Sequence, residues 1–282
     1  MLKIALPNKG GLADDARCLT GEAGYQCRRS ARELAVRDTE NGVEFIFLRP
    51  RDIPVYVSNG TIDLGITGRD LARESETGVV ELLALGFGRS TFRYAVPVDS
   101  GLTPDTLRDV RIATSYPALV RADMAKRGVT CEVICLDGAV EVSVRLGVAD
   151  AIADVVQTGR TLREAGLKLV GEPILASEAV VIGRQAPQTD EDGAHAFLER
   201  LRGIVVAREY VMVEYDVPAR LLDEACEITP GIESPTVAPL NEPEWKAVKS
   251  MARKRDVNRM MDRLATLGAR GIIITDIRTC RL

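Results

Sequence analysis

The chain has 282 residues, longer than one average domain, and its 46% hydrophobic content is enough for well-packed cores. Basic and acidic side chains nearly balance, 37 against 41, and neither sign forms a block, which disfavours binding to nucleic acid or to an anionic membrane. No stretch approaches the roughly 20 apolar residues of a membrane span. The N-terminal run Met1–Pro7 is too short for a signal peptide, so we expect a cytoplasmic protein.

The first two-thirds of the chain alternate short β-branched runs with helical patterns, which predicts parallel sheets covered by helices. Strands are expected at 2–6, 43–48, 62–66, 92–97, 111–114, 131–135, 151–156, 168–170 and 178–183. Helices are expected at 12–23, 50–59, 68–74, 117–127, 138–147 and 160–166. The strand ends run into Gly, Ser, Thr, Asn or Pro before a helix begins, and ligands bind at such ends in open α/β sheets.

A short pattern occurs twice in this region. Gly60–Asp63 leads through a strand into Thr67-Gly68-Arg69, and Gly147–Asp150 leads through a strand into Thr158-Gly159-Arg160. The repetition predicts two similar lobes, each with a strand-to-helix turn directed at a shared site. A chance match between such short segments stays open.

The last third has a different organisation. Residues 186–194 form a polar break, and 195–206 read as a helix. The pattern then predicts, in order, a strand at 208–216, a helix at 218–227, strands at 235–239 and 245–252, a helix at 256–267 and a strand at 271–277. This β-α-β-β-α-β order is that of a ferredoxin-like module, and its sequence poor in reactive groups suggests regulation.

Reactive side chains are scarce. The six cysteines form no C-x-x-C pair, which predicts buried free thiols in a reducing compartment. The single histidine, His195, is expected at the surface, so a Ser-His-Asp mechanism or a histidine metal site is disfavoured. We therefore expect chemistry that depends on positioning and electrostatics, without a protein nucleophile.

The strongest candidate site runs from Asp150 to Leu162. A buried strand ends in a tight turn that opens a helix, where free backbone N–H groups and the helix dipole favour a phosphate. Gly159 allows close approach, Thr158 and Thr161 supply hydroxyls, Arg160 supplies charge, and Asp154 is placed to accept hydrogen bonds from a ribose diol. The competing interpretation is an ordinary helix cap with a structural Asp154.

The N-terminal region offers matching groups. Lys9, Arg49 and Asp70 each follow a predicted strand, and Gly86–Ser90 reads as a glycine-rich hinge that places Ser90 at the site. Together Lys9 and Arg49 make a plausible polyanion site. Taken singly, each such residue is more often a solvated surface group or a helix cap than a ligand-binding group.

Several segments carry a family resemblance over essentially the whole chain. They are Leu6–Gly10, Phe47–Pro50, Asp63–Gly68, Leu85–Gly88, Thr229–Thr236, Thr275–Arg278 and, most specific, Glu141-x5-Gly147-x-Ala149-x2-Ile152-x-Asp154-Val155-x2-Thr158-Gly159-x-Thr161-Leu162. On these segments the chain resembles long-form ATP phosphoribosyltransferase.

The resemblance implies an α/β fold with a two-lobed, periplasmic-binding-protein-like catalytic part. Residues 1–90 and 184–209 would form the first lobe, and 91–183 the second lobe with the phosphoribosyl-binding loop. Residues 210–282 would form an ACT-like (ferredoxin-like βαββαβ) regulatory domain.

The implied reaction transfers the phosphoribosyl group of 5-phosphoribosyl 1-pyrophosphate to N1 of ATP, with Mg²⁺ bound mainly through the pyrophosphate. By the same resemblance, the phosphoribosyl group is held by Asp154, Val155, Thr158, Gly159, Arg160, Thr161 and Leu162. Nucleotide and phosphate groups are assigned to Lys9, Arg49, Asp70, Ser90, Tyr116 and Glu141.

The third domain would bind histidine as a feedback inhibitor through Asp216, Ile232, Ser234, Thr236 and Gly271. Turn and helix-start chemistry explains the same residues without a ligand. The family further implies a homodimer that associates to a homohexamer, and no need for a separate synthetase-like partner.

Three alternatives stay open at this stage. The first is a two-lobe solute-binding protein without turnover, against which the absent signal peptide argues. The second is a ligand-sensing regulator, which lacks a visible basic output surface. The third is a phosphoribosyltransferase for another base, because ATP as acceptor depends on the resemblance alone.

Overall fold

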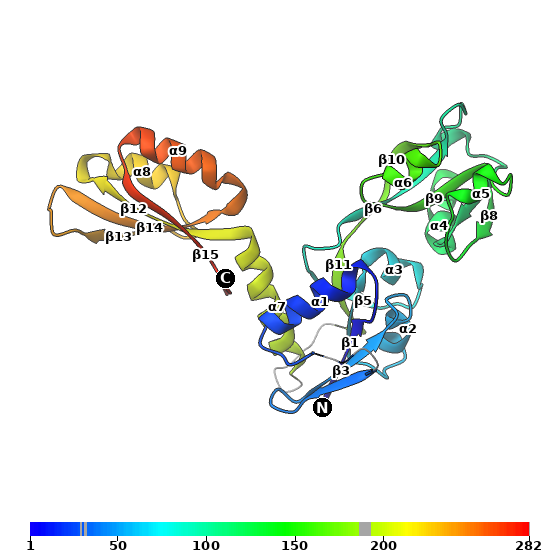
Figure 1. The fold of residues 1–282 in the computed structure, drawn as a ribbon, viewed down its shortest axis with the longest axis horizontal. Helices are drawn as coiled ribbons and strands as arrows, with labels where there is room; N and C mark the ends of the chain where they lie inside the picture. Colours follow the sequence, from blue (N-terminus) through cyan, green and yellow to red (C-terminus); the bar gives the residue numbers. More distant parts are fainter. Residues whose placement is uncertain (29, 31–32, 186–192, 282) are drawn as a thin grey trace. The chain divides into compact units, whose positions relative to one another are not determined.

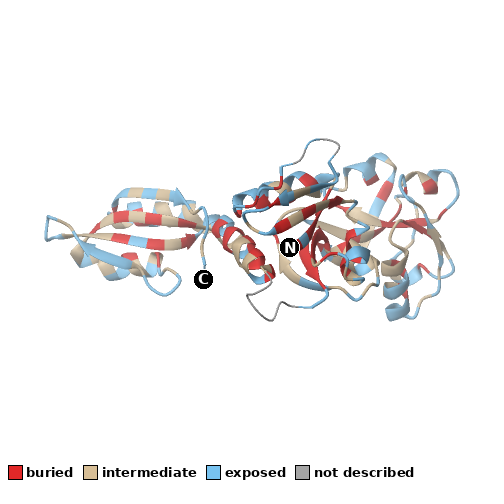
Figure 2. Ribbon diagram, turned by 90° about the horizontal axis from the view of Figure 1, so that it is seen from below, coloured by how far each residue is buried: buried red, intermediate tan, exposed pale blue. Residues whose placement is uncertain are grey.

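A computed structural model describes residues 1–28, 30, 33–185 and 193–281. It divides into two compact units, Met1–Leu198 and Glu199–Leu282, and the boundary falls within helix α7 (Ala194–Glu209). Figure 1 shows the sheets of both units, and Figure 2 shows that buried residues concentrate in their strands. The predicted polar break at 186–194 lies largely outside the described residues.

The first unit contains two sheets with helices between their strands. The first sheet has β1 (Leu2–Pro7), β2 (Ala35–Asp38), β3 (Val43–Leu48), β4 (Leu64–Gly68), β5 (Val80–Ala84) and β11 (Ala179–Gly183). The second has β6 (Ser90–Pro97), β7 (Arg111–Thr114), β8 (Glu132–Cys135), β9 (Ala151–Val156) and β10 (Leu167–Ser177). The helices are α1 (Gly11–Glu22), α2 (Ile53–Ser58), α3 (Arg69–Glu74), η1 (Pro104–Thr106), α4 (Pro117–Arg127), α5 (Val142–Arg145) and α6 (Arg160–Glu164).

The sheets are mixed, which corrects the prediction of parallel sheets. The first has the order β2-β3-β1-β4-β11-β5, in which β1 is parallel to β3 and β4 while β11 is antiparallel to β4. The second has the order β10-β6-β9-β7-β8, in which β7 is parallel to β8 and β9 while β6 is antiparallel to β9. Strands β6 and β11 enter a sheet from the other lobe and run against its parallel strands, and the edge strand β2 is antiparallel to β3.

The two sheets share one topology. Apart from the additional edge strand β2, each sheet has a central strand (β1 or β7) between two parallel strands (β3 and β4, or β8 and β9). The strand that arrives from the other lobe, β11 or β6, lies beside β4 or β9. The repeated sequence pattern falls on β4 with α3 and on β9 with α6, which occupy equivalent positions. The two matched turns therefore lie at corresponding places in the two lobes.

The chain passes between the lobes twice, from β5 to β6 and from β10 to β11. The predicted return near residue 184 is wrong by several residues, because β11 already pairs with β4 and β5 of the first sheet. The return therefore lies between Ser177 and Ala179. Burial follows the strands, with Phe45 and Phe47 in the first sheet and Phe92 and Tyr94 in the second almost inaccessible.

The second unit is an antiparallel module. After the end of α7 it comprises β12 (Tyr210–Pro218), η3 (Ala219–Leu221), α8 (Leu222–Ile228), β13 (Thr236–Pro239), β14 (Trp245–Arg253), η4 (Lys254–Asp256), α9 (Val257–Leu267) and β15 (Arg270–Asp276). The strand order β13-β14-β12-β15 and the β-α-β-β-α-β succession confirm the predicted ferredoxin-like module. Strand β12 alternates between core and periphery, and Val211, Val213 and Tyr215 pack in the core with Leu264 of α9.

Several element predictions need correction. Strands β2 and β5 were not predicted, and α5 has 4 residues where a helix over 138–147 was expected. Glycines 138 and 147 flank α5 and Ala139 has a φ of 51°, so the backbone leaves the helical region on the N-terminal side. Strand β10 runs over 11 residues, because an irregularity between Val170 and Leu175 interrupts its register without ending it.

All six cysteines are free, as expected, but their burial differs from the prediction. Cys27 alone is buried, and Cys18 and Cys135 are exposed. Cys135 ends the edge strand β8, where one side of the strand has no neighbour. His195 is exposed on α7. In the part of the chain that the structure describes, no helix combines the length and apolar character needed to cross a membrane.

Candidate functional site

The predicted site residues of the first unit follow parallel strands. Lys9 follows β1, Arg49 follows β3 and Asp70 follows β4, so all three lie at the carboxyl edge of the first sheet. Open α/β sheets bind ligands at this edge. Lys9 and Arg49 are exposed, and within the described residues neither side chain makes a hydrogen bond or ion pair.

The second sheet repeats this arrangement. Tyr116 follows β7, Glu141 precedes α5 after β8, and the loop from Asp154 continues from β9 into α6. Strand β6 runs antiparallel to β9, and Thr91 pairs with Val156. Ser90, which is half-buried, therefore begins β6 at the same edge as the end of β9.

The turn after β9 is accessible. Thr158, Arg160 and Thr161 are exposed, Gly159 has a φ of 67°, and Leu162 is buried in the core beneath them. A residue with a side chain would be strained at that φ, so glycine permits the tight turn. Nε of Arg160 donates a hydrogen bond to Oε1 of Glu164 at 2.7 Å, so the charge of the guanidinium is partly neutralised by a carboxylate on the next turn.

Asp154 is a largely buried carboxylate whose pKa is raised by its surroundings. Burial raises its pKa, the nearby carboxylates of Glu141 and Asp70 raise it further, and the N–H of Val155, donating at 2.7 Å, opposes them. Acidic groups from β4–α3 and β8–α5 therefore lie close enough to the end of β9 to act on Asp154. A buried carboxylate with a perturbed pKa is typical of functional sites.

Asp70 and Tyr116 are brought into direct contact. The hydroxyl of Tyr116 donates to Oδ2 of Asp70 at 3.0 Å, and burial raises the pKa of Tyr116, with the Asp70 carboxylate adding to the shift. The hydroxyl of Ser177 donates to Oδ1 of Asp70 at 2.8 Å and accepts from its backbone N–H at 3.0 Å. Asp70 is 7% exposed, so both carboxylate oxygens are engaged by protein groups.

Sequence reasoning missed three residues that complete this contact. They are Ser177, which bonds Asp70, Arg51, whose Nη2 donates to the carbonyl of Ser115 at 2.7 Å, and Glu74 on α3. The four-residue spacing of Asp70 and Glu74, which puts both on one helix face, was an available signal for Glu74. The partners of Arg51 and Ser177 lie too far along the chain for any local pattern to indicate them.

The carboxylates of this edge are few for a protein-bound metal ion. Among the described residues, no group of three or more His, Cys, Asp or Glu side chains is arranged to hold a metal ion. Mg²⁺ commonly takes one or two carboxylates and completes its shell with water and substrate phosphates. The neighbouring carboxylates of Asp154 and Glu141 fit that limited role.

In the second unit, the predicted regulatory residues fall in two places. Asp216 lies on β12 opposite Arg270 of β15, and a Cβ on Gly271 would lie 3.8 Å from Oδ2 of Asp216. Ile232 and Ser234 are exposed on the segment that joins α8 to β13, and Thr236, the first residue of β13, is exposed as well. No hydrogen bond between described side chains joins the two groups directly.

A buried polar network lies beneath that segment. The hydroxyls of Tyr215 and Thr229 are 2.7 Å apart, and each lies 3.1 Å from the carbonyl of Ala225. One hydroxyl donates to the other, and the second donates to that carbonyl. Ser250 donates to the carbonyl of Thr229 at 2.9 Å. The network anchors the start of the segment to α8, β12 and β14.

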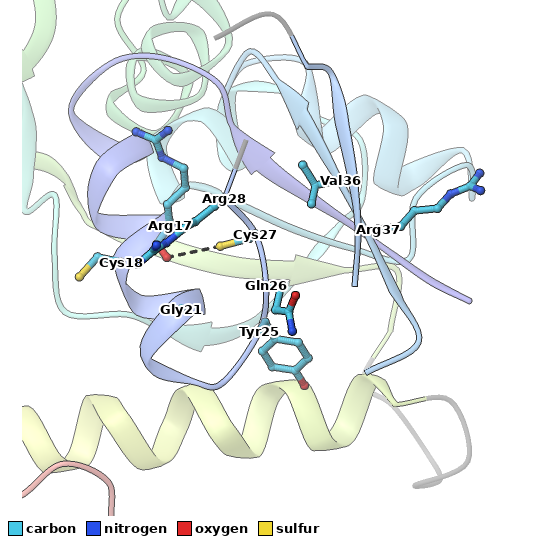
Figure 3. A pocket seen from close by; sticks show the side chains of 9 residues that line it. All are labelled: Arg17, Cys18, Gly21, Tyr25, Gln26, Cys27, Arg28, Val36 and Arg37. Carbon is cyan, nitrogen blue, oxygen red and sulfur yellow. Dashed lines mark hydrogen bonds between the residues drawn. The ribbon is translucent and has the colours of Figure 1, made fainter. Parts of the chain in front are cut away.

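A pocket of about 900 Å³ lies elsewhere in the first unit. It is lined by residues of α1, of segment 25–28 and of β2, including Arg17, Cys27 and Arg37 (Figure 3). The Arg17 and Arg37 side chains point in different directions, and they form ion pairs with Asp14 and Glu44. None of the predicted site residues lines this pocket.

The two lobes and their facing strand ends define a two-lobed α/β protein with an appended antiparallel module. Comparisons with known families and proteins identify it further. Residues 49–203 match the family model described as ATP phosphoribosyltransferase, and residues 207–279 match the one described as HisG, C-terminal domain. The chain belongs to the ATP phosphoribosyltransferase family, the enzymes of the first step of histidine biosynthesis, in the long form with the C-terminal domain.

Relatives match over the full length. The chain is 61% identical to ATP phosphoribosyltransferase of Salinibacter ruber, over 100% of both chains. It is 54% identical to that of Nocardia farcinica, over 100% of this chain and 99% of the relative. A solved ATP phosphoribosyl transferase (HisG:HisZ) complex from Thermotoga maritima has a chain with a TM-score of 0.64 and 28% identity, covering 73% of this chain and 99% of its own.

Proposed function

We propose that the turn from Asp154 to Leu162 binds the phosphoribosyl group of 5-phosphoribosyl 1-pyrophosphate, and that the facing edge binds ATP. The observation that supports the first assignment is the exposed Thr158–Thr161 turn at the carboxyl end of β9, with Gly159 at a φ of 67°. The first amides of a helix have no intrahelical partner and suit a phosphate oxygen. Asp154, at the end of the same strand, accepts hydrogen bonds from the ribose hydroxyls.

The residues of the first sheet supply charge for the rest of the substrates. The exposed cations Lys9 and Arg49 neutralise phosphate groups, while Asp70, Ser90 and Tyr116 position the nucleotide. Glu141 supports the phosphoribosyl side through its closeness to Asp154. Catalysis then follows from aligning N1 of the adenine with C1 of the sugar, which requires no protein nucleophile.

The reaction is proposed to depend on Mg²⁺. When bound to the pyrophosphate, Mg²⁺ neutralises the charge that develops on the leaving group. The carboxylates of Asp154 and Glu141 are the groups of this chain that would face it. They serve as partial ligands or as acceptors for its water molecules.

The second unit is proposed to bind histidine as a feedback inhibitor. Asp216 pairs with a cationic group of the ligand, and Ile232, Ser234, Thr236 and Gly271 surround it. Because the regulatory module is part of the same chain, no separate regulatory subunit is needed. We further propose a homodimer that associates to a homohexamer and works in the cytoplasm, where ATP and the phosphorylated sugar are available and thiols stay reduced.

The phosphoribosyl assignment is tested with Thr161→Ala and Asp154→Ala. Each variant removes a hydrogen bond in which one partner is charged, either the substrate phosphate or the carboxylate of Asp154. The affinity for 5-phosphoribosyl 1-pyrophosphate should therefore fall about 10- to 100-fold. Calorimetric titration of the sugar substrate measures it, and the absorbance change on adding Mg²⁺ and ATP measures turnover. Thr130→Ala is the matched control, because Thr130 is exposed in the same lobe but precedes β8, at the opposite edge of the sheet. Unchanged affinity in both variants would refute the assignment.

A further inference from the structure

Helix α4 begins against a carboxylate from the other lobe. Glu74, at the end of α3, accepts hydrogen bonds from the backbone N–H groups of Ala118 at 3.1 Å and Leu119 at 3.0 Å. The two amides lie in the first turn of α4, where helix N–H groups have no intrahelical partner. A carboxylate there also complements the positive end of the helix dipole.

This cap comes from a distance in the chain. Tyr116 occupies the N-cap position of α4 but makes no side-chain capping bond, and Pro117 at the next position has no N–H to donate. The capping carboxylate instead belongs to Glu74, 44 positions before Ala118, in the lobe built on the first sheet. Glu74 therefore joins the two lobes as well as capping a helix.

Two further contacts act on the same few residues. The hydroxyl of Tyr116 donates to Asp70, and the guanidinium carbon of Arg51 lies 5.1 Å from the centroid of the Tyr116 ring while Nη2 donates to the carbonyl of Ser115. Asp70 and Glu74 extend from one face of α3, four residues apart. The helix thus holds the Tyr116 side chain through Asp70 and the following backbone through Glu74.

We propose that Glu74 is a positioning residue for the reaction: by fixing the start of α4, it keeps Tyr116 of the second lobe against Asp70 of the first. The proposal rests on the nucleotide role proposed above for Asp70 and Tyr116. Without Glu74, the hydroxyl–carboxylate bond to Asp70 and the contacts of Arg51 remain between this segment and the first lobe. Phe92 and Thr114 still hold Tyr116, but both belong to the second lobe and do not fix it against the first. ATP binding then has to restore an arrangement that the native chain already has.

Glu74→Ala and Glu74→Gln test the proposal in the full-length enzyme. Loss of a helix cap costs about 0.5–2 kcal/mol, so the KM for ATP should rise about two- to thirtyfold in Glu74→Ala. The kcat and the KM for the phosphoribosyl substrate should change less than about twofold. Glu74→Gln keeps the side-chain length and one acceptor oxygen, so its KM should lie between. Arg73→Ala is the control, because Arg73 is an exposed neighbour on the same helix.

A double-mutant cycle with Tyr116→Phe separates positioning from stability. If Glu74 acts through Tyr116, Tyr116→Phe alone raises the KM for ATP, and adding Glu74→Ala raises it little further. The proposal would be overturned if the two substitutions raised the KM for ATP independently, so that their fold-changes multiplied in the double variant. It would also be overturned if Glu74→Ala left this KM unchanged, or if Arg73→Ala raised it equally. An unchanged KM in Tyr116→Phe would remove the nucleotide role of Tyr116 and the proposal with it, whereas failure confined to the Glu74 variants leaves that role intact.

Discussion

Replacing Thr229 with valine tests the buried network of the second unit. Thr229 has 0% exposure, and its hydroxyl makes two hydrogen bonds, with Tyr215 at 2.7 Å and with the carbonyl of Ala225 at 3.1 Å. Valine has nearly the same shape, so the change removes the hydroxyl without leaving a cavity. Each bond is worth about 0.5–1.5 kcal/mol net, which sets a range of about 1–3 kcal/mol for the pair.

We expect the loss of stability in Thr229→Val to lie in the lower half of that range. In the variant the hydroxyl of Tyr215 can donate instead to the carbonyl of Ala225, 3.1 Å away, so no buried donor is left without an acceptor. We therefore expect Thr229→Val to lower the free energy of unfolding of the second unit by about 1–2 kcal/mol. With an m-value of about 1–2 kcal/mol/M, the urea midpoint falls by roughly 0.5–2 M.

The chain contains one tryptophan, which makes the measurement selective. Trp245 lies on β14 of the second unit, and the guanidinium carbon of Arg270 is 4.9 Å from its ring centroid. Tryptophan fluorescence in urea therefore follows this unit alone, at a fixed protein concentration. Thr266→Val is the control, because Thr266 is exposed on α9 and the same change there should cost less than about 0.5 kcal/mol. Equal midpoints for the two variants would refute the reasoning.

Two further predictions concern the first unit. Because burial and two carboxylates raise the pKa of Asp154 above the ordinary 3.8, stability is lost as pH rises through that raised pKa. Without substrate, Asp154→Asn should therefore have a higher melting temperature than the wild type at pH 7, and the difference should shrink toward pH 4. A difference in melting temperature that does not depend on pH would contradict this. A Cβ on Gly65 would lie 2.3 Å from Cγ2 of Ile53, so Gly65→Ala should cost about 1–3 kcal/mol. Gly21→Ala, with nothing within 4 Å, should be neutral or slightly stabilising, and equal thermal melts of the two glycine variants would exclude the steric explanation.

Local patterns predicted the elements whose sequence carries a clear start and stop. Helix α4 has Pro117 at its start and Gly128 in the left-handed region at its end, and its bounds were predicted without error. Strand β9 is a continuous apolar run and was equally clear. The strand-to-helix turns were predicted for the same reason, and they carry most of the candidate site.

Other features depend on distant parts of the chain. Strands β2 and β5 lie at the two edges of the first sheet, where a strand packs against one neighbour and needs no strong apolar pattern. The direction of β6 and β11 follows from how the chain passes between lobes, which periodicity does not encode. The contacts of Glu74, Arg51 and Ser177 join residues whose separation in sequence hides them from any short window.

The pairing of β6 with β10 ends with Ser90 opposite Ser177. The whole second lobe is thus an insertion whose two ends are one strand spacing apart, about 4.8 Å along the hydrogen-bonding direction. Such ends can be joined to each other, or exchanged for those of another lobe, with little loop-closure entropy to overcome. The lobe that holds the proposed phosphoribosyl turn is therefore a natural unit for transplantation into a related scaffold, where a different first lobe would present a different acceptor.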